Sequence, residues 1–214
     1  MTTMKPEIDY TLYLVTDREL MSSASVGESV RQAIAGGCTV VQLREKSCSS
    51  RKFYETAHSI REITSRLGVP LIINDRPDIA LAADADGVHV GQDDLPCGAV
   101  RRIVGNDKII GVSVSNLREA LAARDAGADY LGVGAMYATG AKPDAGIAGM
   151  EDLRMIRAAI ALPIVVIGGI NADTVPNFKD TGIDGIAAVS AIVASGDVAG
   201  AARKLKKIFA EFRR

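Results

Sequence analysis

Eight short apolar runs recur along the chain, most of them rich in Val and Ile, with longer mixed segments between them. The runs are hydrophobic without strict alternation, which is typical of strands that are buried on both faces of a parallel sheet. The strands predicted in this way begin at Thr11, Val40, Pro70, Gly87, Ile109, Tyr130, Pro163 and Gly185.

The segments between the runs have helical periodicity. In 50–67, apolar residues from Phe53 to Leu67 recur at steps of three and four, and charged residues occupy the other face. A similar apolar stripe extends from Val198 to Phe212. Glycines that can end a helix in the left-handed conformation precede four of the predicted strands. They are Gly36-Gly37, Gly68, Gly127 and Gly182.

Eight strands that alternate with helices in 214 residues fit the lower size limit of the (β/α)8 TIM barrel. Open doubly wound sheets more often have five or six strands. No Pro-, Gly- or Ser-rich linker divides the chain, so we expect residues 1–214 to form a single α/β barrel domain.

Composition excludes several classes of function. The hydrophobic share of 48% supports one sizeable core, and the net charge of −1 gives no overall field for nucleic acid or an anionic membrane. The chain has no Trp and few aromatic residues for base stacking. No run is long enough to span a membrane and the first ten residues are polar, so we expect a cytoplasmic location. The three cysteines are odd in number and predict reduced thiols.

Polar residues concentrate at the ends of the predicted strands, where barrel enzymes carry their chemistry. The second strand continues into Gln42, Arg44 and Lys46, alternate residues that share one face of an extended segment. An arginine fork and a mobile lysine suit a polyanion better than a neutral ligand. A solvated strand end is the alternative interpretation.

Carboxylates follow the third and fourth strands. Asp75 comes directly after Asn74, and Asp94 closes the segment 91–94. Oxygen ligands without a His/Cys cluster favour Mg²⁺, which takes one or two carboxylates and completes its shell with water and substrate phosphates. The alternative role is helix capping, because Pro77 and Pro96 follow closely.

A second anion site is predicted on the later strands. Gly168-Gly169 and Val189-Ser190 end the seventh and eighth strands, where barrels commonly bind a phosphate through backbone N–H groups and a helix N-terminus. Ser113 ends the fifth strand, and the loop 137–143 carries Lys142, which can close over phosphates. The residues alone thus predict a Mg²⁺-assisted polyphosphate site and a monophosphate site, and therefore two phosphorylated small-molecule substrates.

The chain resembles the thiamine-phosphate synthase family in segments that run from the first strand to the last. These segments are YLVTD from Tyr13, QLREK from Gln42, IIND from Ile72, GVHVGQDD from Gly87, GVS from Gly111, VGAMYATGAKPDA from Val133, IGGI from Ile167 and AVSAI from Ala188. The resemblance implies a transferase that condenses 4-amino-5-hydroxymethyl-2-methylpyrimidine diphosphate with a thiazole phosphate, releasing pyrophosphate by a dissociative route.

The resemblance also implies roles for individual residues. It gives Asp75 and Asp94 to the Mg²⁺ and a catalytic role to Arg44, Lys46, Ser113 and Lys142. The three cationic side chains of this set would stabilise charge on the leaving group. The pyrimidine diphosphate would contact Gln42, Leu43, Arg44, Glu45, Lys46, Asn74, Ser113 and Lys142. The thiazole phosphate would contact Thr139, Gly140, Ala141, Gly169, Val189 and Ser190.

One position departs from the family pattern. The phosphate loop usually reads close to F-P-T-x-T-K, and here Ala141 replaces the second threonine. Loss of that hydroxyl is expected to weaken thiazole phosphate binding by on the order of 1–3 kcal/mol unless water or backbone donors compensate.

Three alternatives remain at this level. They are a thiazole tautomerase of the same fold, another phosphate-binding barrel such as an isomerase, and a catalytically weakened barrel that senses thiamine precursors. A tautomerase needs no diphosphate or Mg²⁺ site, so the retained QLREK segment, Asp75, Asp94 and Lys142 oppose it. Which form of the thiazole is used, and whether the chain forms a homo-oligomer, is left open.

Overall fold

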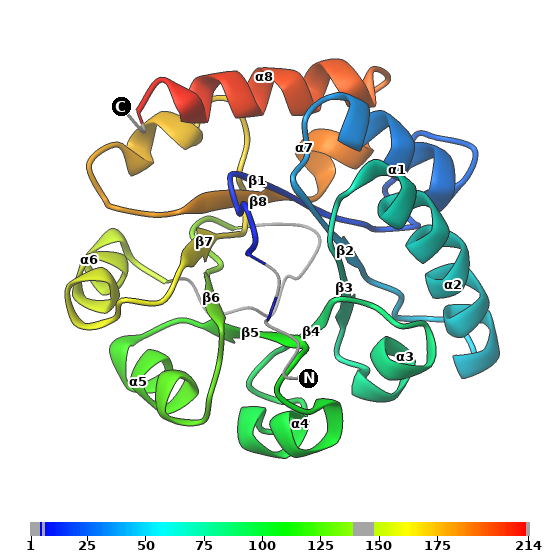
Figure 1. Cartoon of the computed structure of the whole chain (residues 1–214). Helices are drawn as coiled ribbons and strands as arrows, with labels where there is room; N and C mark the ends of the chain where they lie inside the picture. The colour runs from blue at the N-terminus through cyan, green and yellow to red at the C-terminus, as the bar shows by residue number, and fades with distance from the viewer. Residues whose placement is uncertain (1–4, 6, 139–147, 213–214) are drawn as a thin grey trace.

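The computed structural model describes residues 5, 7–138 and 148–212, and these form a closed barrel of eight parallel strands in chain order (Figure 1). Each strand pairs with its sequence neighbours, and Leu12 opposite Ile186 closes the ring. The predicted (β/α)8 fold is thereby confirmed. The strands are β1 (Leu12–Val15), β2 (Val40–Leu43), β3 (Leu71–Asn74), β4 (Gly87–Val90), β5 (Ile109–Val114), β6 (Tyr130–Val133), β7 (Ile164–Val166) and β8 (Gly185–Ala188).

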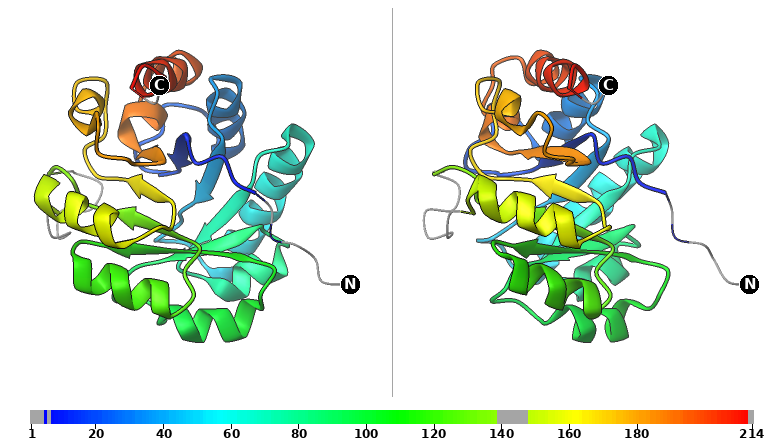
Figure 2. Two further views of the ribbon diagram at one scale, coloured as in Figure 1. Left: turned by 60° about the vertical axis from the view of Figure 1, so that its left-hand side comes forward. Right: turned by 90° about the vertical axis from the view of Figure 1, so that its left-hand side faces the viewer.

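Helices surround the strands (Figures 1 and 2). Among the described residues, none of them is long and apolar enough to cross a membrane. They are α1 (Val26–Ala35), α2 (Ser50–Leu67), α3 (Pro77–Ala82), α4 (Cys97–Val104), α5 (Leu117–Asp125), α6 (Met150–Ala159), the 3₁₀ helix η1 (Val175–Phe178), α7 (Ser190–Val193) and α8 (Val198–Ala210).

The helix predicted from 50 to 67 is α2. The Ser49 hydroxyl accepts a hydrogen bond from the Lys52 backbone N–H at its start, and Gly68 ends it with a φ of 67°. Most of the predicted apolar face is buried, from Phe53 to Ile63, but Leu67 is 50% exposed. The periodicity and the glycine at the end therefore predicted both ends correctly, and the buried stripe ends one turn earlier than predicted.

The segment before Gly182 differs from the prediction. Gly182 has the positive φ expected of a helix end, 73°, but the element before it is the 3₁₀ turn η1 rather than an α-helix. Pro176 lies in the first turn of η1, and Asp180 adopts a φ of 62°. Pro removes a backbone donor and the left-handed residue turns the chain, so a longer helix does not form.

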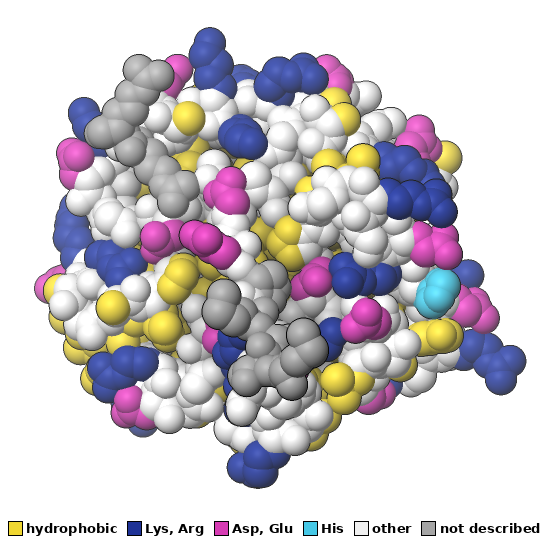
Figure 3. All heavy atoms as spheres, in the orientation of Figure 1, with side chains coloured by type: hydrophobic (Ala, Val, Ile, Leu, Met, Phe, Trp, Pro, Cys, Tyr) yellow, Lys and Arg dark blue, Asp and Glu magenta, His cyan; other side chains and the backbone are white. Residues whose placement is uncertain are grey.

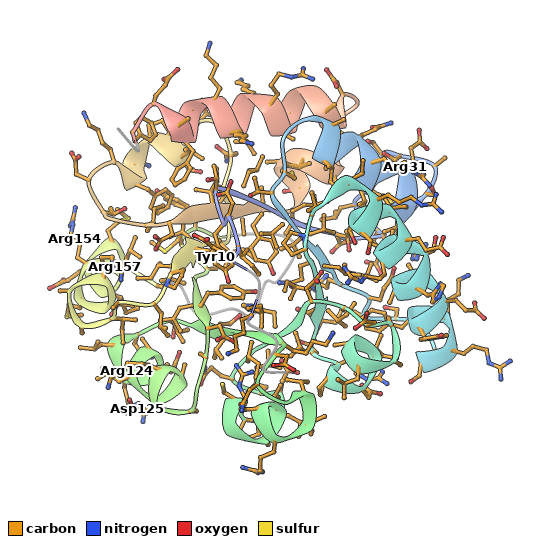
Figure 4. The ribbon with its side chains drawn as sticks, in the orientation of Figure 1. Tyr10, Arg31, Arg124, Asp125, Arg154 and Arg157 are labelled. Carbon is orange, nitrogen blue, oxygen red and sulfur yellow. The ribbon has the colours of Figure 1, made fainter. Side chains whose placement is uncertain are left out.

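Apolar side chains form two layers. Strand residues that point outward, such as Leu14 and Leu43, pack against the helices. Residues that point inward, including Tyr13 and Tyr130, fill the barrel interior. On the face seen in Figure 3, basic and acidic side chains are interspersed. Figure 4 shows Tyr10 inside the ring of strands, and the segment that carries it enters from the end opposite the strands' carboxyl ends.

Candidate active site

A cavity opens at the carboxyl ends of the strands. Ser113 on β5 and Asn74 on β3 line it together with residues from the other strand ends. The predicted site residues that the cavity brings together are Gln42, Arg44, Lys46, Asn74, Asp75, Asp94, Ser113, Gly169, Val189 and Ser190. Thr139, Gly140, Ala141 and Lys142 lie outside the described residues.

The alternation at β2 has two consequences. Gln42, Arg44 and Lys46 line the cavity, as their spacing predicts. Leu43 faces the other way and is fully buried between barrel and helices, and the Glu45 carboxylate pairs with Arg18 at 2.6 Å. The side chains of Leu43 and Glu45 therefore do not line this cavity, and their contact with a diphosphate stays a prediction.

Arg44 is held in place by the end of β1. Its Nη1 donates to the Asp17 carboxylate at 2.8 Å, and its backbone N–H donates to the Thr16 hydroxyl at 3.0 Å. Asp17 is itself fixed, because it accepts hydrogen bonds from the backbone of Glu19 and Leu20. The sequence analysis missed Asp17, although it closes the YLVTD segment at a strand end where polar residues are functional candidates.

Asp75 and Asp94 meet at the rim. Burial raises the pKa of the Asp94 carboxyl above its usual value, and the nearby Asp75 raises it further, against a hydrogen bond from the Gly91 backbone that lowers it. The Lys46 ammonium donates to the Asp75 carboxylate. Two adjoining carboxylates that draw in a cationic side chain form a local cation site.

The alternative role of these aspartates is not seen. The residues that precede α3 and α4 are Arg76 and Pro96, and neither helix start has a side-chain cap. Asp75 instead has a φ of 64°, a conformation that non-glycine residues seldom adopt, and its backbone N–H donates to the His89 carbonyl at 2.8 Å. The helix-capping interpretation is therefore wrong.

The donor set fits Mg²⁺ with limited protein ligation. Among the described residues, no group of three or more His, Cys, Asp or Glu side chains is arranged to hold a metal ion. Two hard carboxylates suffice for Mg²⁺ when waters and substrate phosphates occupy the other positions. The same set is poor in the nitrogen and sulfur ligands that Zn²⁺ prefers.

The far side of the cavity is built from glycine backbone. Gly168 and Gly169 have φ values of 94° and 66° after β7. A Cβ on Gly168 would lie 2.6 Å from the Ala135 Cα, and one on Gly169 would lie 2.6 Å from the Tyr137 Cβ. Only glycine fits this turn, which presents bare backbone beside Ser190.

Buried polar side chains lie below the rim, and the sequence analysis missed them. Tyr13, His89 and Tyr130 line the cavity and join Gln42 and Ser113 in hydrogen bonds. The available signal was strand alternation, since His89 and Tyr130 fall on the inward positions of GVHVG and YLGVG.

A closed barrel whose mouth combines basic side chains, paired carboxylates and a glycine turn defines a phosphate-handling (β/α)8 enzyme. The model of the thiamine monophosphate synthase family matches residues 12–192. The chain belongs to this family, as the motifs predicted.

Individual relatives match this chain over nearly their full length. The chain is 60% identical to a thiamine-phosphate synthase of Clostridium beijerinckii over 206 residues, which covers 96% of this chain and 99% of that protein. It is 53% identical to one of Chloroflexus aurantiacus, covering 94% and 93%. The solved structure of a thiamine phosphate pyrophosphorylase from Pyrococcus furiosus has 42% identity and a TM-score of 0.88, covering 95% and 97%.

Proposed function

We propose that this protein is a transferase that condenses 4-amino-5-hydroxymethyl-2-methylpyrimidine diphosphate with a thiazole phosphate to give thiamine phosphate and pyrophosphate in the cytoplasm. The observation that carries the proposal is the cavity itself. Arg44 and Lys46 stand beside the Asp75–Asp94 pair at one side, and the Gly168-Gly169 turn stands at the other. A polyphosphate site and a monophosphate site thus share one mouth, in a chain that belongs to this family.

The leaving-group side would hold the diphosphate. Arg44, oriented by Asp17, offers a planar fork to phosphate oxygens, and Lys46 adds a mobile charge. Asn74 and Ser113 add uncharged donors from β3 and β5. Lys142 belongs to the same set by family resemblance.

Asp75 and Asp94 would hold Mg²⁺, with water and diphosphate oxygens completing its shell. When bound, the ion neutralises charge that develops on the leaving pyrophosphate. The Lys46 ammonium now pairs with Asp75, so Lys46 is placed to turn to the diphosphate once the carboxylate has another cation. The protein's part is to hold the two carboxylates together at the rim of the cavity.

The thiazole phosphate would lie against Gly169, Val189 and Ser190. Backbone N–H groups could approach an anion closely there, because the glycine turn has no side chain. By family resemblance Thr139, Gly140 and Ala141 contribute from the loop.

This arrangement needs no protein nucleophile. The C–O bond to the pyrimidine methylene breaks and its electron pair leaves with pyrophosphate, because the electron-rich aminopyrimidine stabilises the resulting cation. The thiazole nitrogen then supplies the electron pair of the new C–N bond. The residues contribute by orienting the two rings and by stabilising the leaving group.

The deciding experiment is a turnover assay with both substrates and Mg²⁺, in which thiamine phosphate and pyrophosphate are measured. Equal amounts of the two products are expected. Rearrangement of the thiazole without a C–N bond would establish the tautomerase instead, and binding of both substrates without product would establish the sensor.

The metal assignment has its own test. Asp75→Asn and Asp94→Asn should each weaken the apparent Mg²⁺ affinity by on the order of tenfold to a hundredfold, with little loss of folding stability. Asp93→Asn is the matched control, because Asp93 is exposed, adjacent in sequence and absent from the cavity lining. An unchanged Mg²⁺ dependence of turnover in both variants would reject these ligands.

A further inference from the structure

A chain of hydrogen bonds crosses the barrel interior and reaches the cavity at both ends. The Gln42 Nε2 donates to the Tyr13 hydroxyl at 3.0 Å, and the Tyr13 and Tyr130 hydroxyls are 2.8 Å apart. The Tyr130 hydroxyl lies 2.8 Å from Nδ1 of His89, and Nε2 of His89 lies 2.9 Å from the Ser113 Oγ. All five side chains line the cavity.

The strands are shaped to hold this chain. A Cβ on Gly111 of β5 would lie 2.1 Å from the Tyr130 Cζ and 2.4 Å from the His89 Nδ1, and one on Gly132 of β6 would lie 3.0 Å from the His89 Cε1. Glycine weakens a strand interior, so its presence here marks a close approach. The approaching groups are the imidazole and the phenol.

The Gln42 amide determines which group donates in each bond of this chain of hydrogen bonds. The Tyr13 oxygen accepts from the amide, and Tyr13 is only 1% exposed, so its own hydrogen must go to Tyr130 if it is to be satisfied. Tyr130 then donates to Nδ1 of His89. Burial raises the pKa of both tyrosines above the usual value, so both phenols retain the protons that this direction requires.

We propose that His89 is a neutral imidazole protonated at Nε2, and that it acts as a positioning residue for Ser113. Because Nε2–H donates to the Ser113 oxygen, the Ser113 hydrogen is directed away from His89 and is offered to an acceptor in the cavity. If the diphosphate binds as set out above, on which this second part rests, that acceptor is an anionic oxygen of the pyrimidine diphosphate.

All the hydrogen bonds of this chain could also run in the opposite direction, with every donor and acceptor still paired. The Ser113 hydroxyl would then be oriented differently. If Gln42 turned its amide oxygen to Tyr13, every bond would reverse, His89 would be protonated at Nδ1, and Ser113 would donate to His89. The serine oxygen would then present lone pairs to an anion beside Arg44 and Lys46. The proton position on His89 therefore reports the direction of the whole chain.

Nitrogen NMR of the ¹⁵N-labelled wild-type protein measures this directly, without substrate. The chain has two histidines, and His58 lies exposed on α2, so a His58→Gln variant assigns the His89 signals. We expect a protonated Nε2 and a bare Nδ1. Protonation at Nδ1, or at both nitrogens, would overturn the proposal.

Two tyrosine variants test the role of the chain. Tyr130→Phe removes the donor to Nδ1 and should convert the His89 signals to a mixture of tautomers. Tyr10→Phe is the matched control. The Tyr10 ring packs against Tyr130 with centroids 4.8 Å apart and planes tilted by 37°, and its hydroxyl is not part of the chain of hydrogen bonds. The same spectral change in both variants would show a packing effect and overturn the assignment.

A double-mutant cycle tests the positioning of Ser113. Tyr130→Phe should lower kcat/KM by about threefold or more in the wild type, and by less than about twofold in a Ser113→Ala background, because the effect passes through Ser113. Additive losses would overturn the positioning role. Absence of turnover in the wild type would instead refute the proposed function, and the tautomer of His89 would still be decided by NMR.

Discussion

At the residue scale, Arg44 illustrates how one side chain is oriented by another. Asp17 fixes the guanidinium from β1, and Asp17 is fixed by two backbone N–H groups of its own turn. The Arg44 side chain is therefore ordered before a ligand binds, so less side-chain entropy is lost on binding.

Replacement of Arg44 by Lys should therefore weaken binding of the diphosphate, although the positive charge is kept. The ammonium cannot form the planar fork, so we expect the KM for the pyrimidine diphosphate to rise by about tenfold or more. Arg31→Lys on α1 is the control, since Arg31 lies at the outside of the ring in Figure 4. Equal effects in the two variants, or no effect of Arg44→Lys, would contradict the diphosphate contact.

The three thiols should differ in reactivity. Burial raises the pKa of the Cys38 thiol to about 12 and also raises that of Cys97, whereas Cys48 is exposed. A raised pKa leaves less thiolate at a given pH, and the thiolate is the species that is alkylated. Mass spectrometry after brief iodoacetamide treatment at about pH 8 should find label on Cys48 alone, and on all three thiols in urea. Rapid labelling of Cys38 in the folded protein would contradict this.

At this scale, the sequence predicted the residues at the rim of the cavity better than those in the barrel interior. Arg44, Asp75 and Asp94 could be recognised because each follows an apolar run at a strand end. His89 and Tyr130 lie within the runs, where a buried structural role is the ordinary interpretation. Their hydrogen bonds depend on the barrel bringing β4, β5 and β6 together, which no local pattern encodes.

At the element scale, every predicted strand is present because buried parallel strands have a clear local signature. The exception is the segment before Gly182, where η1 with Pro176 in its first turn replaces the predicted helix. Leu43 takes the outer side of β2 by simple alternation, although the family resemblance gave it a contact with the diphosphate. The site residues of the loop from Thr139 to Lys142 stay predictions, because they lie outside the described residues.

Two glycines allow a test of how tightly the elements fit. Gly111→Ala would place a methyl against Tyr130 and His89 in the barrel interior, and should reduce the free energy of unfolding by about 1–3 kcal/mol or more. Gly98→Ala in α4 meets nothing within 4 Å and should increase that free energy by about 0.4–1 kcal/mol. Urea denaturation measures both, and two changes of the same sign would contradict the packing described.

At the scale of the whole molecule, anion binding must be local. The net charge is −1, and basic and acidic side chains are interspersed on the one face that Figure 3 shows. The molecule as a whole therefore does not attract a polyanion over long distances. In the proposed function, selectivity for a diphosphate would come instead from Arg44, Lys46 and the carboxylate pair, which line one cavity.

Because that cavity draws on strands from the whole ring, a ligand bound there should stabilise the complete barrel. Mg²⁺ with pyrophosphate at about one hundred times its Kd should add about 2.7 kcal/mol to the free energy of unfolding. For a chain of this length that corresponds to a rise in Tm of about 5–10 °C. Chelation of Mg²⁺ should remove most of the rise, since the diphosphate would then face Asp75 and Asp94 without a bridging cation. Differential scanning calorimetry measures the shift, and Asp93→Asn should retain it while Asp75→Asn loses it. A rise that survives chelation undiminished would show that pyrophosphate binds through Arg44 and Lys46 alone, and would refute a bridging role for Mg²⁺.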